Sequence, residues 1–174
     1  AGVKLEPLTP QRQEEEDAHE HLRALLEDAV TFFKHHLLQN AAGKPARDYL
    51  TRRGLTDATL ETFGLGYAPD SWDAGLRYFT GKGYTTADLL ATGLITERQG
   101  GEGHYDRFRN RIMFPIRDAL GRMAGFGARI LDPNDVPKFL NSPQTALFDK
   151  GRLLYGLDQA RKAIRSADQV VIVE

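Results

Sequence analysis

Apolar side chains recur every three or four positions between Ala18 and Leu37, with charged and polar residues between them. This spacing places the apolar residues on one face of an α-helix. Thr9 followed by Pro10 is a typical helix start, with the threonine as N-cap and the proline in the first turn. The pattern therefore predicts one long helix from residue 10 to about residue 39.

Shorter elements follow, and glycine ends most of the helical ones. The pattern predicts, in order, a helix at 45–53 that stops at Gly54, a short helix capped by Thr56, a strand in FGLGYAP (63–69), helices at 72–81 and 86–91, and a strand in GLITER (93–98). The sequence from Arg111 to Leu131 then holds two apolar strands around the turn Asp118–Gly121, which is the pattern of a β-hairpin. Pro115 lacks a backbone donor, so we expect a sheet edge or a bulge there.

The last part of the chain is less regular. The segment 137–156, PKFLNSPQTALFDKGRLLYG, fits neither helix nor strand, and we expect a loop. A helix at 158–166 and an apolar, β-branched strand at 169–174 are predicted after it, and such a strand is typical of a parallel sheet. Together these elements predict an α+β fold with a mixed or antiparallel sheet, followed by the start of an α/β domain.

Composition limits the class of protein. The chain has 174 residues, no cysteine and a net charge of −1, which excludes disulfides, thiolate zinc sites and a histone-like basic protein. No apolar run is long enough to cross a membrane, and the start does not read as a signal peptide. We expect an intracellular protein. The near-neutral total hides a basic stretch, because six arginines lie between Arg107 and Arg129 with Asp118 as the only acid.

Those arginines suggest a binding surface. If extended structure begins near Arg107, then Arg107, Arg109, Arg111 and Arg117 share one face and the other face is apolar and packs inward. Guanidinium groups suit phosphate oxygens. From the pattern alone, phosphate binding and a solvated face with local salt bridges remain equal alternatives.

Two further features carry candidate chemistry. Lys138, Asn141, Lys150 and Arg152 fall within the irregular segment, where the ammonium groups suit phosphates, although Asn-Ser-Pro is also ordinary turn chemistry. Glu174 would lie at the C-terminal end of a parallel strand, where α/β sheets place ligands, and could bind Mg²⁺ or act in acid–base chemistry.

The chain contains a series of distinctive motifs, which are, in sequence order, YLTRRGL, RFRNRIMFPIRD, GFGAR, KFLNSP…FDKG…LYGL and VVIVE. Over residues 40–174 the chain resembles the RNA polymerase core of bacterial DnaG-type primases. The resemblance implies a division into three parts. Residues 1–40 would be a linker and long helix that follow a zinc-binding domain, 41–156 the N-terminal subdomain of the core, and 157–174 the start of a TOPRIM domain.

The resemblance also implies the roles of particular residues. The basic groove of the family for template and nucleotides corresponds here to Arg53, Arg107, Arg109, Arg129, Lys138, Asn141, Lys150 and Arg152. Lys138 and Lys150 would lie beside the active site, and Glu174 would be a metal ligand or proton acceptor for Mg²⁺ or Mn²⁺. The remaining metal ligands would lie outside this chain, and zinc would belong only to the preceding domain.

The implied activity is synthesis of short RNA primers from ribonucleoside triphosphates on single-stranded DNA template at the bacterial replication fork, in the cytoplasm. The implied partner is the replicative helicase, reached through a C-terminal domain, with no membrane. The segment by itself is expected to be inactive. Three alternatives remain: another TOPRIM enzyme such as a topoisomerase or nuclease, a non-catalytic module that binds single-stranded DNA, and a purely structural arginine face.

Overall fold

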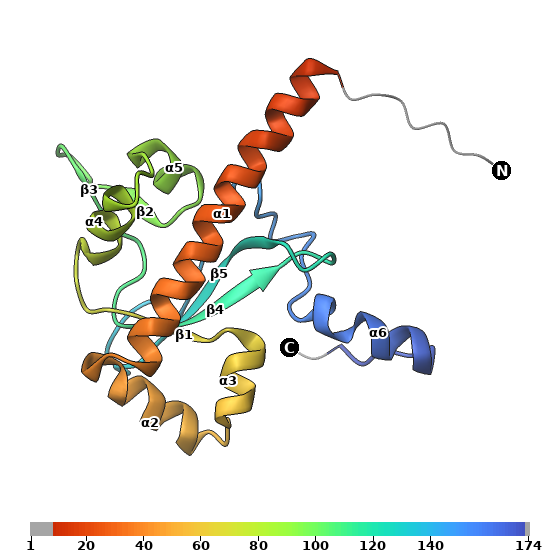
Figure 1. Ribbon diagram of the computed structural model, residues 1–174. Helices are drawn as coiled ribbons and strands as arrows, with labels where there is room; N and C mark the ends of the chain where they lie inside the picture. The colour runs from red at the N-terminus through yellow and green to blue at the C-terminus, as the bar shows by residue number, and fades with distance from the viewer. Residues whose placement is uncertain (1–8, 173–174) are drawn as a thin grey trace.

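The protein is described here by a computed structural model that covers residues 9–172. Figure 1 shows one long helix beside a twisted sheet, with small helices around it. The elements are α1 (Pro10–Leu38), η1 (Ala41–Gly43), α2 (Lys44–Arg52), α3 (Asp57–Phe63), β1 (Gly66–Ala68), α4 (Ala74–Gly81), α5 (Thr86–Ala91), β2 (Ile95–Glu97), β3 (His104–Asp106), β4 (Arg111–Arg117), β5 (Met123–Ile130), β6 (Phe139–Asn141) and α6 (Leu157–Ala167).

The local helix signals are confirmed. Thr9 is the N-cap of α1, where its hydroxyl oxygen accepts from the amide of Arg12 at 3.4 Å. Thr56 and Thr85 cap α3 and α5 in the same way, and Asp88 completes a capping box with Thr85. The predicted fold class is confirmed, and most helix ends fall within two residues of the expected ones.

The main sheet has the strand order β1-β4-β5-β6, and every neighbouring pair is antiparallel. The hairpin β4–β5 turns at Asp118–Gly121 as predicted, with Gly121 at a positive φ of 84°. A separate two-stranded sheet, β2–β3, stands beside it. The strand β2 was predicted, whereas β3 was not, because three residues after a glycine-rich loop give no recognisable alternation.

Pro115 is accommodated as the sequence requires. Although β4 is a central strand, its pairing with β1 ends at Met113, so Pro115 has a partner strand only on the β5 side, where it faces Phe126. The register also shifts between Ile116 and Arg117. Pro115 therefore lies at a local edge, next to a bulge.

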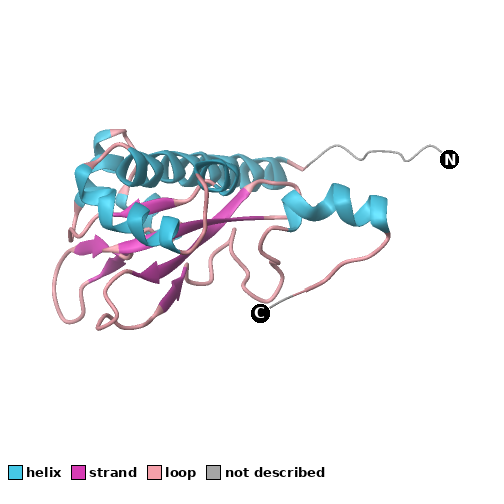
Figure 2. Cartoon of the chain, turned by 90° about the horizontal axis from the view of Figure 1, so that it is seen from below, coloured by secondary structure: helices cyan, strands magenta, loops and turns pink. Residues whose placement is uncertain are grey.

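Helix α1 packs across one face of the sheet, which Figures 1 and 2 show from two directions. Its buried side chains meet the sheet residues that point toward it, and Phe33 contacts Phe126 edge to face at 5.4 Å between ring centroids. A second core forms where α2 and α3 cover Ile112 on the opposite face, with Leu50 and Leu60 around it. Farther along that opposite face, Phe114 and Ile116 are only half-buried.

Two expectations for the C-terminal part are wrong. The segment 137–156 is not irregular throughout, because Phe139–Asn141 form β6 and pair with β5. Residues 169–172 form no strand, since they find no backbone partner among the described strands, and Val171 is 86 % exposed. The helix α6 agrees with the predicted one. Val173 and Glu174 lie outside the described residues, and the expected domain boundaries stay a prediction.

Candidate nucleic-acid interface

Two hollows lie on either side of β6. The first, with a volume of about 530 Å³, lies between the turn before α4, the β2–β3 sheet and the loop before β6. We call it the arginine pocket, after Arg107, Arg109 and Arg111, which line it together with Trp72 and Tyr105. Its rim also carries carboxylates, from Asp70, Asp132 and Asp135.

The three arginines of this pocket make different contacts, and two of them bind backbone carbonyl groups. Arg107 donates through Nε and Nη2 to the carbonyl oxygen of Asn141, at 3.3 and 3.1 Å. Arg111 is 7 % exposed and donates through Nη1 to the carbonyl oxygen of Pro137 at 2.8 Å. Burial lowers the pKa of both guanidinium groups. These two side chains hold the backbone at both ends of the segment that contains β6.

Arg109 instead forms a cluster with two aromatic rings. Its guanidinium lies 4.0 Å from the centroid of the Trp72 ring and 5.0 Å from that of Tyr105, and the two rings are 5.4 Å apart. Trp72 is 58 % exposed, so much of its indole faces solvent. This aromatic cluster, Trp72–Tyr105–Arg109, was missed in the sequence, because nothing in the pattern brings residues 72 and 105 together.

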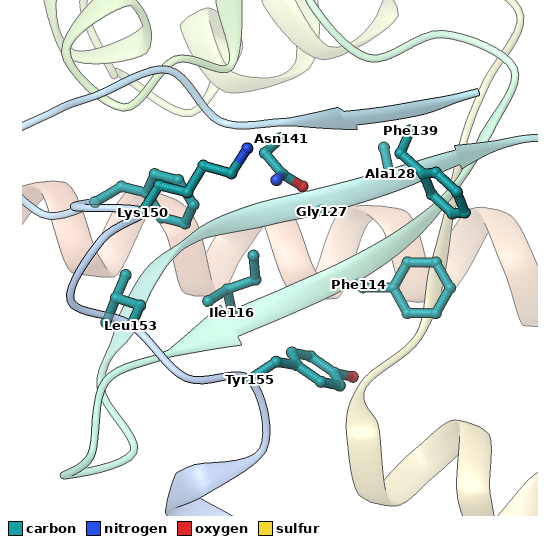
Figure 3. A pocket seen from close by; sticks show the side chains of 10 residues that line it. Phe114, Ile116, Gly127, Ala128, Phe139, Asn141, Lys150, Leu153 and Tyr155 are labelled. Carbon is teal, nitrogen blue, oxygen red and sulfur yellow. The ribbon is translucent and has the colours of Figure 1, made fainter. Parts of the chain in front are cut away.

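The second hollow is a groove of about 460 Å³ on the open face of the main sheet. Its floor is apolar, made by Phe114 and Ile116 of β4 with Gly127 and Ala128 of β5. The walls of this sheet groove are Phe139, Asn141, Phe148, Lys150, Leu153 and Tyr155. Figure 3 shows the ammonium group of Lys150 pointing toward the side chain of Asn141, with Phe139 at the other end of the groove.

Local hydrogen bonds fix the irregular segment that carries Lys150. The hydroxyl of Ser142 is buried and accepts from the amide of Phe126 at 3.0 Å, which ties the segment to β5. The hydroxyl of Thr145 accepts from the amide of Phe148 at 2.9 Å, and the carboxylate of Asp149 accepts from the amide of Gly151 at 2.9 Å. Lys150 is thus placed by a defined backbone rather than by a flexible loop.

Cations also surround Phe139 at its end of the groove. The guanidinium of Arg129 lies 5.1 Å from the centroid of this ring and 5.7 Å from that of Tyr49. The ammonium of Lys138 lies 5.6 Å from the same Phe139 ring, which is 60 % exposed. Arg129 and Lys138 therefore share one exposed aromatic ring, and each cation is attracted to the face of that ring by a modest amount.

The predicted arginine row is wrong in its geometry. Extended structure begins at Arg111, so Arg107 and Arg109 lie in the bend before β4 and do not alternate with it. The face with Arg117 turns toward α1, where Arg117 binds both carboxylate oxygens of Glu27. The apolar face that was expected to pack inward is open at Phe114 and Ile116. Alternation gives which residues share a face, but not which face a helix covers.

Among the described candidate residues, four line neither hollow: Arg53, Arg129, Lys138 and Arg152. Arg129 and Lys138 nevertheless lie beside Phe139, at the end of the sheet groove. Arg152 is highly exposed, and its Nε lies 3.4 Å from a carboxylate oxygen of Asp149. Arg53 is exposed at the C-terminal end of α2 and lines neither hollow. Glu174 lies outside the described residues.

Between residues 9 and 172 no group of three or more His, Cys, Asp or Glu side chains is placed to hold a metal ion. In the same range no helix combines the length and the apolar character needed to cross a bilayer.

Exposed aromatic rings with cationic side chains beside them are typical of domains that bind single-stranded nucleic acid. A sequence model of the family described as "DNA primase catalytic core, N-terminal domain" matches residues 32–161. The chain belongs to this family.

Named relatives agree with the match. The DNA primase of Deinococcus radiodurans is 51% identical over 146 residues, which are 84% of this chain and 24% of the relative. A DnaG primase catalytic domain solved bound to single-stranded DNA is 41% identical with a TM-score of 0.77, covering 85% of this chain and 45% of that one. The RNA polymerase domain of Mycobacterium tuberculosis DnaG is 36% identical with a TM-score of 0.83, covering 89% and 50%. The chain thus spans about a quarter of the length of the curated relative.

Proposed function

We propose that this chain is the N-terminal part of the RNA polymerase core of a DNA primase, a nucleotidyltransferase that makes short RNA primers on single-stranded DNA. In this proposal residues 1–40 lead in from a zinc-binding domain, 41–156 form the N-terminal subdomain and 157–174 begin a TOPRIM domain. The family match over residues 32–161 and the likeness to a primase domain bound to single-stranded DNA support it.

The observation that carries the proposal is the aromatic cluster Trp72–Tyr105–Arg109. A base that stacks on the exposed face of Trp72 would leave its phosphates near Arg109 and the arginine pocket. Stacking on an aromatic ring contributes about 1–3 kcal/mol per base and is tolerant of sequence. Template would therefore be held mainly by stacking and backbone charge, as an enzyme that reads many sequences requires.

The sheet groove on the other side of β6 suits the nucleotide and primer end of the reaction. Its apolar floor can cover a base, the amide of Asn141 can hydrogen-bond to it, and Lys150 can bind phosphate oxygens. Lys138 and Arg129 add positive charge at the opposite end. Fixed cations near a reacting phosphate stabilise the charge that develops there. Arg53 and Arg152 would contribute only general positive charge from outside the hollows.

The metal belongs to a part of the enzyme that the described residues do not form. Mg²⁺ or Mn²⁺ would be held by Glu174 together with carboxylates from the remainder of the protein. The replicative helicase would bind through a C-terminal domain, and the protein would act in the bacterial cytoplasm.

The proposed template site can be tested directly, because Trp72 is the only tryptophan in the chain. We expect oligothymidine to quench its fluorescence, and the affinity to fall steeply with salt. Trp72→Ala should weaken binding measured by anisotropy of labelled DNA about tenfold or more, which corresponds to the loss of one stacked base. Arg109→Gln should flatten the salt dependence by roughly 0.7 in slope, the contribution of one phosphate on a single strand.

A matched control is Arg152→Gln, which removes the same charge from an exposed position that lines neither hollow. It should change affinity much less than Arg109→Gln. Unquenched Trp72 at low salt, or equal effects of the two arginine variants, would show that template does not bind at the aromatic cluster.

A further inference from the structure

Asp106 is a buried carboxylate next to the aromatic cluster, and the proposed function gives it no role. It ends β3 and is 7 % exposed. Its two carboxylate oxygens accept from the amides of Gly75 and Leu76, at 2.7 and 2.8 Å. Both donors are in the first turn of α4, thirty residues earlier in the chain.

These bonds fasten the start of α4. The N-cap position of this helix is Asp73, whose side chain makes no capping hydrogen bond. The first amides of a helix lack partners within the helix, and a carboxylate there satisfies them and favours the positive end of the dipole. Asp106 thus supplies from another element the cap that the local sequence does not provide.

The backbone of Asp106 contacts both halves of the aromatic cluster. Its amide donates to the carbonyl oxygen of Trp72 at 2.8 Å, and its carbonyl oxygen accepts from Nη1 of Arg109. One residue therefore connects to the backbone of Trp72, to the guanidinium of Arg109 and to the helix that begins two residues after Trp72. Gly75 fits closely beneath the carboxylate, since a Cβ at this position would lie 3.3 Å from it.

We infer that Asp106 is a positioning residue for template binding: its carboxylate anchors α4 so that Trp72 and Arg109 are held in their stack. This inference rests on the proposed function, since it is the proposed template site that Asp106 would align. A substitution removes only the two carboxylate bonds. The backbone of Asp106 can still bond to Trp72 and Arg109 in a variant. These bonds form only if α4 and the turn before it keep their position.

The first test uses protein without DNA. Asp106→Asn keeps one acceptor oxygen and turns an NH₂ group toward the second amide, and Asp106→Ala loses both bonds. We expect the emission of Trp72 to shift to longer wavelength and its quenching by acrylamide to rise in the order wild type, Asn, Ala. Unchanged emission and quenching in Asp106→Ala would overturn the inference, whatever happens with DNA.

The second test adds oligothymidine. We expect affinity to fall in the same order, by about tenfold for Asp106→Ala, which matches the loss of the stacked base. Asp73→Asn is the matched control, because it removes a negative charge beside the start of α4 from a side chain that contacts Ser71 and Arg77 but accepts no capping bond from the helix amides. It should leave the emission of Trp72 and the affinity close to wild type. Equal behaviour of Asp73→Asn and Asp106→Asn would assign the effect to charge and refute the anchor.

A third variant distinguishes a loss of stability from a specific loss of DNA binding. Asp28→Asn breaks a clamp between α1 and the α4–α5 turn, where the carboxylate of Asp28 binds Lys82 and Tyr84. It should lower the melting temperature and leave the affinity of the folded protein unchanged. Variants are compared well below their melting temperatures. If Asp28→Asn weakens DNA binding as much as Asp106→Ala, the role of Asp106 is only structural. If wild type binds no DNA while the emission still shifts in Asp106→Ala, the anchor holds and the proposed template site is wrong.

Discussion

Two glycines of β5 should separate stability from ligand binding, although they are only two residues apart. A Cβ at Gly125 would lie 2.8 Å from the ring of Phe148 and 2.9 Å from the hydroxyl oxygen of Ser142. Phe148 and Ser142 are both buried, so displacing either of them would disturb packed contacts. The hydroxyl of Ser142 also accepts from the amide of Phe126, a bond that displacement would weaken. We expect Gly125→Ala to destabilise the protein by about 1–3 kcal/mol, the usual cost of overpacking.

Gly127 faces the sheet groove, and the same substitution there should act differently. Its Cβ would lie 3.2 Å from Oδ1 of Asn141 and 3.7 Å from the side chain of Ile116. The Asn141 amide is half-buried at the edge of an open hollow, so it can turn away. Replacing glycine also reduces the freedom of the unfolded chain, which favours folding by about 0.4–1 kcal/mol. We expect Gly127→Ala to keep wild-type stability within about 1 kcal/mol, and to obstruct the floor of the groove.

Thermal unfolding followed by circular dichroism measures the difference in stability between the two variants. For a chain of this size each kcal/mol shifts the melting temperature by about 2–4 °C, so Gly125→Ala should melt several degrees lower. The difference in nucleotide affinity is measured with a protein that includes the rest of the core. In that protein Gly127→Ala should bind a ribonucleoside triphosphate more weakly than wild type does. A Gly127→Ala protein less stable than Gly125→Ala would show that the contacts of β5 are misassigned. Wild-type nucleotide affinity in Gly127→Ala would show that the groove is not the nucleotide site.

Other predictions concern contacts that hold α1 in place. Burial acts to raise the pKa of Asp28, but hydrogen bonds from Lys82 and Tyr84 outweigh it and the pKa is lowered. The stability that Asp28 contributes is therefore present above pH 3.8 and lost as pH falls through the lower folded value, so acid denaturation of Asp28→Asn should lack this component. Burial and the hydrogen bond to Asp28 raise the pKa of Tyr84 to about 12. The stability that Tyr84 contributes is therefore complete below pH 10.0 and lost as pH rises toward 12. Tyr84→Phe should accordingly make the stability fall less steeply at alkaline pH. Glu27→Gln removes the partner of Arg117 at a half-exposed site and should lower the free energy of unfolding by about 0.5–1 kcal/mol in denaturant titrations, an effect that salt reduces.

The sequence predicted the features that depend on near neighbours. Helix starts at Thr9, Thr56 and Thr85 are set by a side chain that binds an amide three residues on, and such signals are visible in the sequence. The turn at Gly121 is equally local, because a positive φ favours glycine wherever the chain goes next. These elements were therefore predicted close to their observed bounds.

What the sequence did not predict depends on contacts between distant segments. The row of arginines had the right composition for a binding surface, but burial of Arg111 against Pro137 follows from the path of a loop 26 residues later. Trp72 and Tyr105 meet only because β3 folds back against the turn before α4. The apolar stretch at 169–172 has the composition of a strand, yet a strand exists only with a partner, and composition does not show whether one is present.

The strand β6 lies between the two hollows and contributes side chains to both. Phe139 and Asn141 point into the sheet groove, whereas Leu140 lines the arginine pocket. Ladder pairing with β5 fixes one edge of β6, Arg107 holds the carbonyl of Asn141, and Arg111 holds that of Pro137. A strand bound on both edges moves little, so template at the aromatic cluster and nucleotide in the groove would keep a constant separation. In the proposed function Arg107 would act less as a charge for phosphate than as a link between the two surfaces, since its Nε and Nη2 both donate to the carbonyl oxygen of Asn141.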